Sequence, residues 1–357
     1  MAGAVAVRHR GTRARPVVNH GAGPTWLSGP TSDDGTAGVS DAARSLLRGT
    51  VLITQPIHPA GVTRLEAAGL TVRHASSADM NVVRTEIADA VAVVTRSAGL
   101  NAAAIEAGNL LRVIGNHGSG LDAIDLDAAA RRGVPVVRTP GANAPAVAEM
   151  TLALILATLK RLGDADRAVR AGDEDFKYRT RMGDLTGATV GIVGFGAIGA
   201  TVAGILRAAF DVRLLVHTRT PRREAIDRVG GRSVSLKELV SASDVVTLHR
   251  PAEPNHRAVI DAALLALMKP TAVLINTARG SLIEEDALAK ALRDGRLGGA
   301  GLDVARGDRL DPNHPLTAVP NVILTPHVAG SSEGALRRTA LAVVDAVVEV
   351  LRKDPPA

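Results

Sequence analysis

A glycine turn between an apolar run and a helical pattern is the feature that most constrains the fold. Gly194, Gly196 and Gly199 follow the apolar run 189–193 in the spacing G-x-G-x-x-G, and a helix should begin near Ala197. The first glycine permits a tight turn, the second lets the backbone approach a pyrophosphate, and the third lets helix and strand pack closely. Amide N–H groups and the dipole at a helix start favour phosphate charge. The motif predicts a dinucleotide-binding βαβ unit.

Short apolar runs alternate with helical patterns from residue 49 onward. This alternation predicts the α/β fold class, with two doubly wound parallel-sheet (Rossmann-like) domains and a cleft between them. A length of 357 residues with 46% hydrophobic content is enough for two cores. The predicted strands are 50–57, 70–74, 90–95, 111–116 and 134–137 in the first set and 189–193, 212–217, 245–248, 272–276, 299–304 and 322–324 in the second.

Two longer helical patterns organise the chain around these strands. The first, from residue 144 to about 172, is expected to connect the domains, and the second, from about 333 to 351, closes the chain. Residues 1–48 have no periodicity and are rich in Gly, Ala, Arg, Pro and Ser, so we interpret them as a disordered extension.

Composition excludes several classes of function. Residues 1–48 hold six Arg and three acids, so half of the formal net charge of +6 lies there and the rest of the chain is nearly neutral. Because there are also only five aromatic residues, we do not expect nucleic-acid binding. No apolar run is long enough for a membrane helix. The absence of Cys excludes disulfides and thiolate metal sites and fits a cytoplasmic protein, and we expect no metal.

The loop after the run 212–217 bears on the choice of cofactor. In NAD-binding proteins an Asp or Glu about 20 residues past the glycines accepts hydrogen bonds from the adenosine ribose. This chain has Thr218 there, followed by Arg219 and Arg222. A hydroxyl and guanidinium groups attract a 2′-phosphate, so NADP(H) is the better fit. The alternative is a solvated basic loop that tolerates either NAD or NADP.

Three later segments each follow a predicted strand and carry Arg279, Asp303 and His327. Ligands of open α/β sheets bind beyond the carboxyl ends of the strands. These three residues should therefore face the nicotinamide end of one cleft.

Together, the motifs resemble those of the D-isomer-specific 2-hydroxyacid dehydrogenases over nearly the whole of 50–353. The shared motifs are Asn276-Thr-Ala-Arg279-Gly280, Gly301-Leu-Asp303-Val304, Thr325-Pro-His327, Gly118-Ser-Gly120-Leu-Asp122-Ala-Ile-Asp125, Pro140-Gly-Ala-Asn143 and Val147-Ala-Glu149. The resemblance implies a substrate-binding domain of residues 49–145 plus 330–353 and a dinucleotide-binding domain of residues 146–329. It also implies a homodimer that transfers a hydride between NAD(P)(H) and a small 2-hydroxy or 2-oxo acid.

The resemblance further implies a catalytic Arg, His and carboxylate. Arg279 would hold the carboxylate or carbonyl of the substrate with its planar fork. His327 would give a proton to the alkoxide formed on reduction, and take it back on oxidation. A carboxylate hydrogen-bonded to His327 would raise the pKa of the imidazole and set its orientation.

The carboxylate is where this chain departs from the family pattern. Members generally have Glu five residues after the strand Asp, where this chain has Asp308, which is one methylene shorter. Asp308 could instead pair with Arg306 or Arg309 at the surface. Asp311 is the substitute if the register slips.

Substrate recognition is expected from the first domain. The backbone N–H groups of Gly118, Ser119 and Gly120 would form an anion nest for a carboxylate. Arg96 and Ser97 occupy a position that contacts substrate in similar enzymes. Arg96 would either bind a second anionic group of the substrate or form a surface ion pair. The remaining residues predicted to line the cofactor site are Ala197, Ile198, His249, Arg250, Thr277, Ala278, Asp303 and Gly330.

Two other functions remain open at this point. Some proteins with this fold use nicotinamide nucleotides to gate protein–protein contacts, and a measurement of turnover would separate such a nucleotide-sensing binding protein from an enzyme. A formate- or phosphite-type dehydrogenase is the second alternative. Formate oxidation removes no proton from a substrate oxygen and typically pairs the His with Gln, so Asp308 argues against it. Glyoxylate, hydroxypyruvate and larger acids remain open as substrates.

Overall fold

The structure, a computed structural model, describes residues 46–252, 258–307 and 312–353. Its first five strands are β1 (Thr50–Ile53), β2 (Thr71–His74), β3 (Ala90–Thr95), β4 (Val113–Asn116) and β5 (Val136–Arg138). The other strands are β6 (Thr189–Val193), β7 (Arg213–His217), β8 (Gly231–Ser233), β9 (Val245–Leu248), β10 (Val273–Asn276), β11 (Gly299–Leu302) and β12 (Val322–Leu324).

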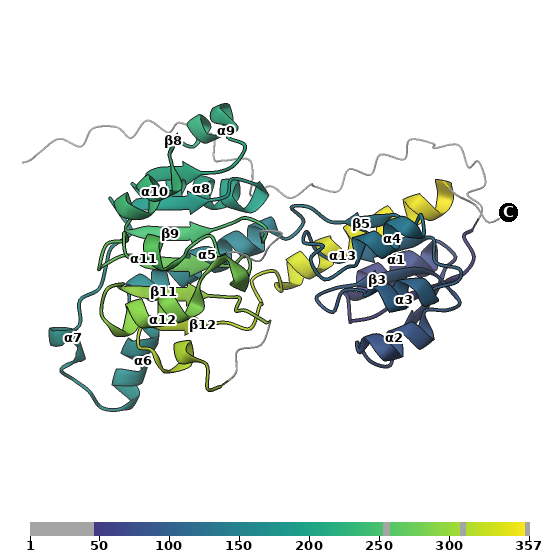
Figure 1. Cartoon of the computed structure of the whole chain (residues 1–357), viewed down its shortest axis with the longest axis horizontal. Helices are drawn as coiled ribbons and strands as arrows, with labels where there is room; N and C mark the ends of the chain where they lie inside the picture. The colour runs from purple at the N-terminus through teal and green to yellow at the C-terminus, as the bar shows by residue number, and fades with distance from the viewer. Residues whose placement is uncertain (1–45, 253–257, 308–311, 354–357) are drawn as a thin grey trace, which may run out of the picture. The chain divides into compact units, whose positions relative to one another are not determined.

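These strands form two parallel sheets (Figure 1). The five-stranded sheet has the order β2-β1-β3-β4-β5, and the seven-stranded sheet has the order β12-β11-β10-β9-β6-β7-β8. In each sheet the chain first builds outward in one direction and then in the other, which defines a doubly wound sheet. The predicted α/β fold class, with two parallel-sheet domains, is confirmed.

Helices cover both faces of the five-stranded sheet. The face that carries Val51 and Ile53 packs against α13 (Glu333–Lys353), and α1 (Pro59–Ala67) lies beside that helix. The opposite face carries Leu52 and packs against α2 (Met80–Glu86), α3 (Ala102–Ala107) and α4 (Leu126–Arg131). Alternate residues of one strand therefore enter two different cores, as the two-residue period of a strand requires.

The seven-stranded sheet is covered in the same way. Ile192 faces α5 (Ala144–Leu159) and α8 (Ala197–Ala209). The adjacent Val193 faces the side covered by α10 (Leu236–Ala242), α11 (Ala262–Leu265) and α12 (Glu285–Arg293). Helix α9 (Arg223–Arg228) packs beside β8. Among the described residues, no helix is long and apolar enough to span a membrane.

Several strand bounds differ from the predicted ones, most clearly β1, which ends at Ile53 where the prediction ran to residue 57. Two larger details also differ from the sequence predictions. The helix expected from 144 to about 172 is broken: α5 ends at Leu159, and α6 (Leu162–Arg170) begins after Arg161. Arg161 has a left-handed backbone (φ 48) and its Nε donates to Asp164 Oδ2 (2.8 Å), so the chain changes direction at this residue. The second difference is the short edge strand β8, which was not predicted.

Three short elements complete the fold, namely helix α7 (Phe176–Arg179) and the 3₁₀ turns Gly280–Leu282 and Pro315–Ala318. Most of the predicted extension, residues 1–45, lies outside the described residues. Within the predicted 1–48, Leu47 is described, and its backbone N–H donates to Ala68 O (3.0 Å).

Candidate active site

Most of the predicted catalytic and cofactor-binding residues follow strand ends along one edge of the seven-stranded sheet. The ends of five neighbouring strands, β6, β9, β10, β11 and β12, are register partners, namely Val193, Leu248, Asn276, Leu302 and Leu324. The glycine turn follows the first strand end, and the other four are followed within three residues by His249, Arg279, Asp303 and His327. Strands β6 and β9 are neighbours at the point where the chain order reverses, which is where ligands of doubly wound sheets bind.

Each glycine of the turn has its own structural reason. Gly194 has a positive φ of 98°, and a Cβ there would collide with the carbonyl oxygen of His249. A Cβ at Gly199 would collide with the carbonyl oxygen of Gly194, so this glycine allows α8 to lie against β6. Gly196 differs because no atom lies within 4 Å of its Cβ position. The turn therefore leaves open space beside the start of α8, where a pyrophosphate fits.

A pocket of about 210 Å³ adjoins this turn. Its walls come from the ends of β6, β7 and β9, and its lining includes Gly194, Gly196, Thr218, Arg219 and His249. Arg250 also lines the pocket, whereas Arg222 does not and instead precedes α9. Ala197 and Ile198 are the first residues of α8.

His249 is buried beside the glycine turn. Its Nε2 lies 2.9 Å from the hydroxyl oxygen of Thr247. Burial lowers the pKa of His249 from 6.5 to about 3, so the imidazole is neutral at physiological pH. His249 therefore shapes the wall of the pocket and brings no positive charge to it.

The turn after β10 presents Arg279. Asn276 is fully buried, and its side chain accepts from the Ala278 N–H (3.0 Å) and donates to the Arg279 carbonyl (2.8 Å). Thr277 is tied to α5 by a hydrogen bond between its hydroxyl and that of Thr151 (3.0 Å). These side-chain bonds fix the backbone of the turn, which limits the positions available to the side chain of Arg279.

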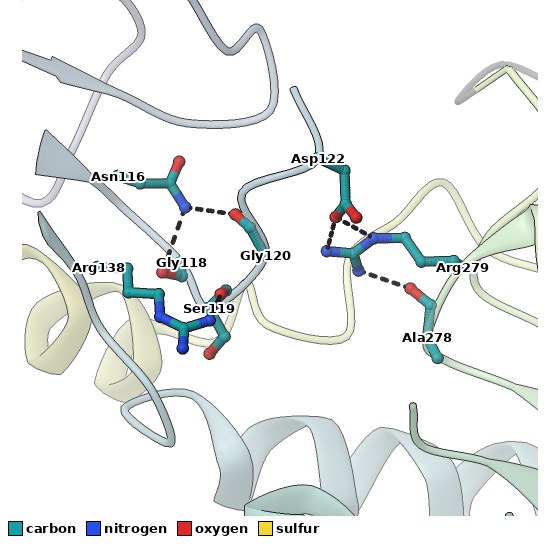
Figure 2. Close-up of polar contacts among 8 residues, drawn as sticks. All are labelled: Asn116, Gly118, Ser119, Gly120, Asp122, Arg138, Ala278 and Arg279. Atoms are coloured by element: carbon teal, nitrogen blue, oxygen red, sulfur yellow. Dashed lines mark hydrogen bonds and ion pairs between the residues drawn. The ribbon is translucent and has the colours of Figure 1, made fainter. Parts of the chain in front are cut away.

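The guanidinium of Arg279 contacts the loop after β4 of the other sheet (Figure 2). Its Nε and Nη2 both donate to Asp122 Oδ2, at 2.9 and 2.8 Å, and Nη1 donates to the carbonyl oxygen of Ala278 at 2.7 Å. A Cβ at Gly120 would collide with Nη2, so the guanidinium lies directly against the Gly120 backbone.

Asp303 anchors the turn that carries His327. Asp303 is fully buried, and its Oδ1 accepts from the Thr325 hydroxyl (2.6 Å) and the Val328 N–H (2.9 Å). Its Oδ2 accepts from the Ala329 N–H (2.9 Å), and its backbone carbonyl accepts from the His327 N–H (2.8 Å). His327 itself is exposed and has a positive φ of 55°. The described contacts of the Asp303 carboxylate are therefore with this turn, which sequence reasoning did not foresee.

The predicted catalytic carboxylate, Asp308, lies outside the described residues, as do Arg309 and Asp311. The described residues on either side are held by one carboxylate. Glu285 Oε1 accepts from the Arg306 N–H (2.7 Å), and Glu285 Oε2 lies 3.2 Å from His314 Nε2. Beyond the His327 turn, Gly330 lies close to Asn143, so that a Cβ at Gly330 would be 2.9 Å from Asn143 Nδ2.

One of the three backbone N–H groups of the predicted anion nest already donates a hydrogen bond within its own loop. The Gly118 N–H donates to the carbonyl of Asn116 (2.8 Å), whereas the N–H groups of Ser119 and Gly120 have no acceptor among the described residues. Asn116 Nδ2 donates to Gly120 O (2.7 Å) and Gly118 O (3.3 Å), and Arg138 Nη1 donates to Ser119 O (3.1 Å) (Figure 2). The side chains of Asn116 and Arg138 therefore fix the backbone of this loop.

Arg96 lies at the end of β3, close to His117. Its Nη1 donates to the carbonyl oxygen of Pro56 (2.7 Å), and no carboxylate pairs with Arg96 among the described residues. Burial and the positive charge of Arg96 lower the pKa of His117 to about 4, and His117 Nε2 is buried without a hydrogen-bond partner. Ser97 is exposed, and its hydroxyl accepts from Gln55 Nε2 (3.2 Å). The surface ion pair considered for Arg96 is thus not formed within the described structure.

Sequence reasoning assigned no role to three residues that position site groups: Asn116, Asp122 and Asn276. All three lie within or beside motifs that were recognised. The signal that could have found them is a polar residue at a buried strand end, or within a glycine-rich loop at that edge.

Two parallel α/β domains and a dinucleotide-type glycine turn place the chain in the class of dinucleotide-binding α/β proteins. Residues 152–329 match the family described as "D-isomer specific 2-hydroxyacid dehydrogenase, NAD binding domain". The chain belongs to this family.

Named relatives agree with this assignment. The chain is 41% identical over 256 residues to a glyoxylate reductase of Aeropyrum pernix, covering 69% of this chain and 75% of the relative. It is 31% identical over 307 residues to a D-3-phosphoglycerate dehydrogenase of Archaeoglobus fulgidus, covering 85% of this chain and 58% of the relative.

Among solved structures, the chain resembles the NADPH-dependent glyoxylate/hydroxypyruvate reductase of Sinorhizobium meliloti in complex with NADP and malonate. The TM-score is 0.73 at 31% identity, and the match covers 85% of this chain and 93% of the neighbour. The protein is therefore an oxidoreductase that acts on CH–OH groups and links NAD(P) to hydride transfer on a 2-hydroxy or 2-oxo acid. The expectation of an enzyme of this family is confirmed.

Proposed function

We propose that the enzyme reduces a small 2-oxo acid with NADPH, using Arg279 to hold the acid and His327 to protonate the new alkoxide. The observation that carries this proposal is the shared sheet edge. Arg279 and His327 each lie three residues past a strand end in one register row, which also leads to the glycine turn. Strands β10 and β12 are separated by β11 alone, so their ends are about 10 Å apart. Two long side chains can span this distance toward one small substrate.

The bound nicotinamide would supply the hydride on reduction, or accept it on oxidation. Residues of this chain would bind the substrate and transfer the proton. The guanidinium of Arg279 binds the substrate carboxylate and thereby fixes the carbonyl carbon in place. His327 donates a proton to the developing alkoxide, which is typically a 10²–10⁴-fold contribution. Asp308 completes the proposed set by accepting a hydrogen bond from the protonated imidazole.

The decisive measurement is the oxidation of NADPH and NADH against a panel of 2-oxo acids, beginning with glyoxylate and hydroxypyruvate. Replacement of His327 by Ala should lower kcat by about 10²-fold or more while leaving the NADPH dissociation constant unchanged. His74→Ala is the matched control, because His74 is an exposed histidine at the end of β2 in the other sheet. Unimpaired turnover by His327→Ala would remove His327 from its proposed role.

We also propose a preference for NADP(H). Thr218 and Arg219 line the pocket beside the glycine turn. NAD-binding proteins carry at this position the carboxylate that binds the ribose hydroxyls. Replacing Thr218 with Asp would place a negative charge next to the 2′-phosphate. We expect Thr218→Asp to raise KM for NADPH about tenfold or more and to leave KM for NADH similar or lower. Equal efficiency of the unaltered enzyme with both cofactors would favour the tolerant basic loop instead.

Substrate acids with a second anionic group are a further part of the proposal. Arg96 contacts a backbone carbonyl and has no counter-charge among the described residues, which supports a role in binding an acidic group. The test compares glyoxylate with 2-oxo acids that carry a second carboxylate or a phosphate. Arg96→Gln should raise KM for the dianionic acids only. An equal effect on glyoxylate would contradict the role.

We propose, finally, that the enzyme is a homodimer. Large apolar side chains are exposed on and beside α6 and α7, among them Val169 (80% exposed) and Tyr178 (78%). Light scattering after size exclusion gives the molecular mass directly. A monomer at micromolar concentration would refute this part of the proposal.

A further inference from the structure

We propose that Asp122 is a positioning residue for the reaction. In this proposal, which rests on the role proposed above for Arg279, Asp122 and Gly120 hold one edge of the Arg279 guanidinium and leave the opposite edge for the substrate carboxylate. Asp122 belongs to the loop after β4, and Arg279, 157 positions later, belongs to the turn after β10.

A count of donors shows which edge is left. A guanidinium has five N–H groups. One on Nε and one on Nη2 donate to Asp122 Oδ2, and one on Nη1 donates to Ala278 O (Figure 2). One N–H remains on Nη1 and one on Nη2. Because Nε and Nη2 share one acceptor, the N–H that remains on Nη2 points toward the Nη1 side. A carboxylate can accept both remaining donors end-on, in the two-bond geometry that Arg forms with planar anions.

Gly120 provides the room that this arrangement needs. A Cβ at residue 120 would collide with Nη2 of Arg279 and would lie 2.8 Å from Asp122 Oδ2. The ion pair and any side chain at residue 120 therefore exclude each other. The glycine serves the close approach of Arg279.

The loop that carries Asp122 is itself fixed. Asn116 is buried and donates to the carbonyls of Gly118 and Gly120, and Arg138 donates to the carbonyl of Ser119. The Thr139 N–H donates to Gly118 O (3.0 Å). Asp122 therefore extends from a braced loop, which allows it to restrict the position of Arg279.

The exposure of the ion pair between Asp122 and Arg279 indicates that the pair orients the Arg279 side chain. The side chains of Arg279 and Asp122 are 33% and 46% exposed, so water screens much of their attraction and the pair adds little to folding stability. A free Arg side chain samples many rotamers, and ordering it at each binding event opposes binding. An Arg held in advance avoids that loss, so Asp122 should act on substrate binding and turnover through Arg279.

A double-mutant cycle on kcat/KM tests this idea with glyoxylate as the probe. Asp122→Ala should lower kcat/KM about tenfold to a hundredfold, the effect expected for loss of a hydrogen bond between charged groups. The same change in an Arg279→Ala background should cost nothing further. Asp122→Asn should fall in between, because its amide oxygen still accepts a hydrogen bond. The NADPH dissociation constant should stay within about twofold throughout.

Two further variants sharpen the result. Asp127→Asn is the matched control, since Asp127 is an exposed carboxylate in the first turn of α4, and it should leave kcat/KM unchanged. Gly120→Ala should reproduce the loss caused by Asp122→Ala, because its methyl group displaces Nη2.

The outcomes separate the two proposals. An equal loss from Asp122→Ala with and without Arg279 would show that Asp122 acts independently, and the positioning role would be wrong while the role of Arg279 stands. Full activity of Arg279→Ala would overturn both. A loss in folding stability that accounts for the whole loss in activity, measured by thermal unfolding, would also overturn the positioning role.

Discussion

Replacement of Asp303 by Asn removes one of the two oxygens that hold the turn of His327. Oδ1 accepts from the Thr325 hydroxyl and the Val328 N–H, and Oδ2 accepts from the Ala329 N–H. An amide can keep the first oxygen, but its NH₂ group would then face the Ala329 N–H. This buried donor would lose its acceptor, which costs about 1–3 kcal/mol. We expect the free energy of unfolding to fall by that amount.

Activity should fall as well, because the same turn carries His327, the proposed proton donor. A displacement of ~1 Å at a catalytic group can lower the rate by about 10²-fold. We therefore expect kcat of Asp303→Asn to fall by about tenfold to a hundredfold at saturating glyoxylate and NADPH. Urea unfolding followed by circular dichroism gives the stability, and steady-state kinetics gives kcat.

Asp261→Asn is the control for this experiment. Asp261 caps α11 with a single hydrogen bond, from the Leu264 N–H to Oδ1 (2.9 Å), and Asn serves as well as Asp at such a position. This variant should change the free energy of unfolding by less than about 0.5 kcal/mol. If Asp303→Asn matched Asp261→Asn in both stability and kcat, the assignment of Asp303 as the anchor of this turn would be refuted.

The glycine turn and the buried His249 give two further predictions. Gly199→Ala should lower the free energy of unfolding by about 1–3 kcal/mol, since its methyl group meets the carbonyl of Gly194. Gly196→Ala should fold normally and lose NADPH affinity. Thermal unfolding measures the stability and fluorescence titration measures the affinity, and equal stabilities of the two variants would contradict this prediction. Burial lowers the pKa of His249 to about 3, so below about pH 6.5 this histidine takes up a proton in the unfolded chain and not in the folded protein. The free energy of unfolding therefore keeps this contribution above about pH 6.5 and falls by up to ~1.4 kcal/mol per pH unit between about 6.5 and 3. His249→Gln should remove that part of the slope in urea unfolding between pH 7.5 and 5, and an unchanged slope would count against it.

The sequence predicts the elements whose causes are local. The runs 90–95, 189–193 and 245–248 coincide with β3, β6 and β9, because buried parallel strands are short apolar runs bounded by turn residues. The start of α8 at Ala197 follows from the glycine spacing. Alignment of the strand ends then follows from parallel pairing, and this is why residues far apart in sequence could be assigned to one edge.

What the sequence does not predict depends on contacts made over long distances. β8 is an edge strand of three residues, two of them exposed, and has no apolar pattern to reveal it. The break at Arg161 depends on a left-handed residue that carries no glycine signal. The contact between Asp122 and Arg279 joins side chains that follow different sheets, and spacing within either motif says nothing about it. Asp303 was expected to face a cofactor, and its bonds to the His327 turn depend on the fold of residues more than twenty positions away.

At position 327, the residue that would give the more stable fold differs from the residue that the proposed proton transfer needs. A left-handed conformation costs a residue with a Cβ about 1–2 kcal/mol, and glycine adopts it without that cost. A laboratory selection for heat resistance that ignores turnover should therefore enrich His327→Gly, giving hardier molecules that have lost the imidazole. The histidine that this chain keeps at position 327 gives up that share of stability, and the proposed transfer of a proton by its imidazole is what it would gain in return.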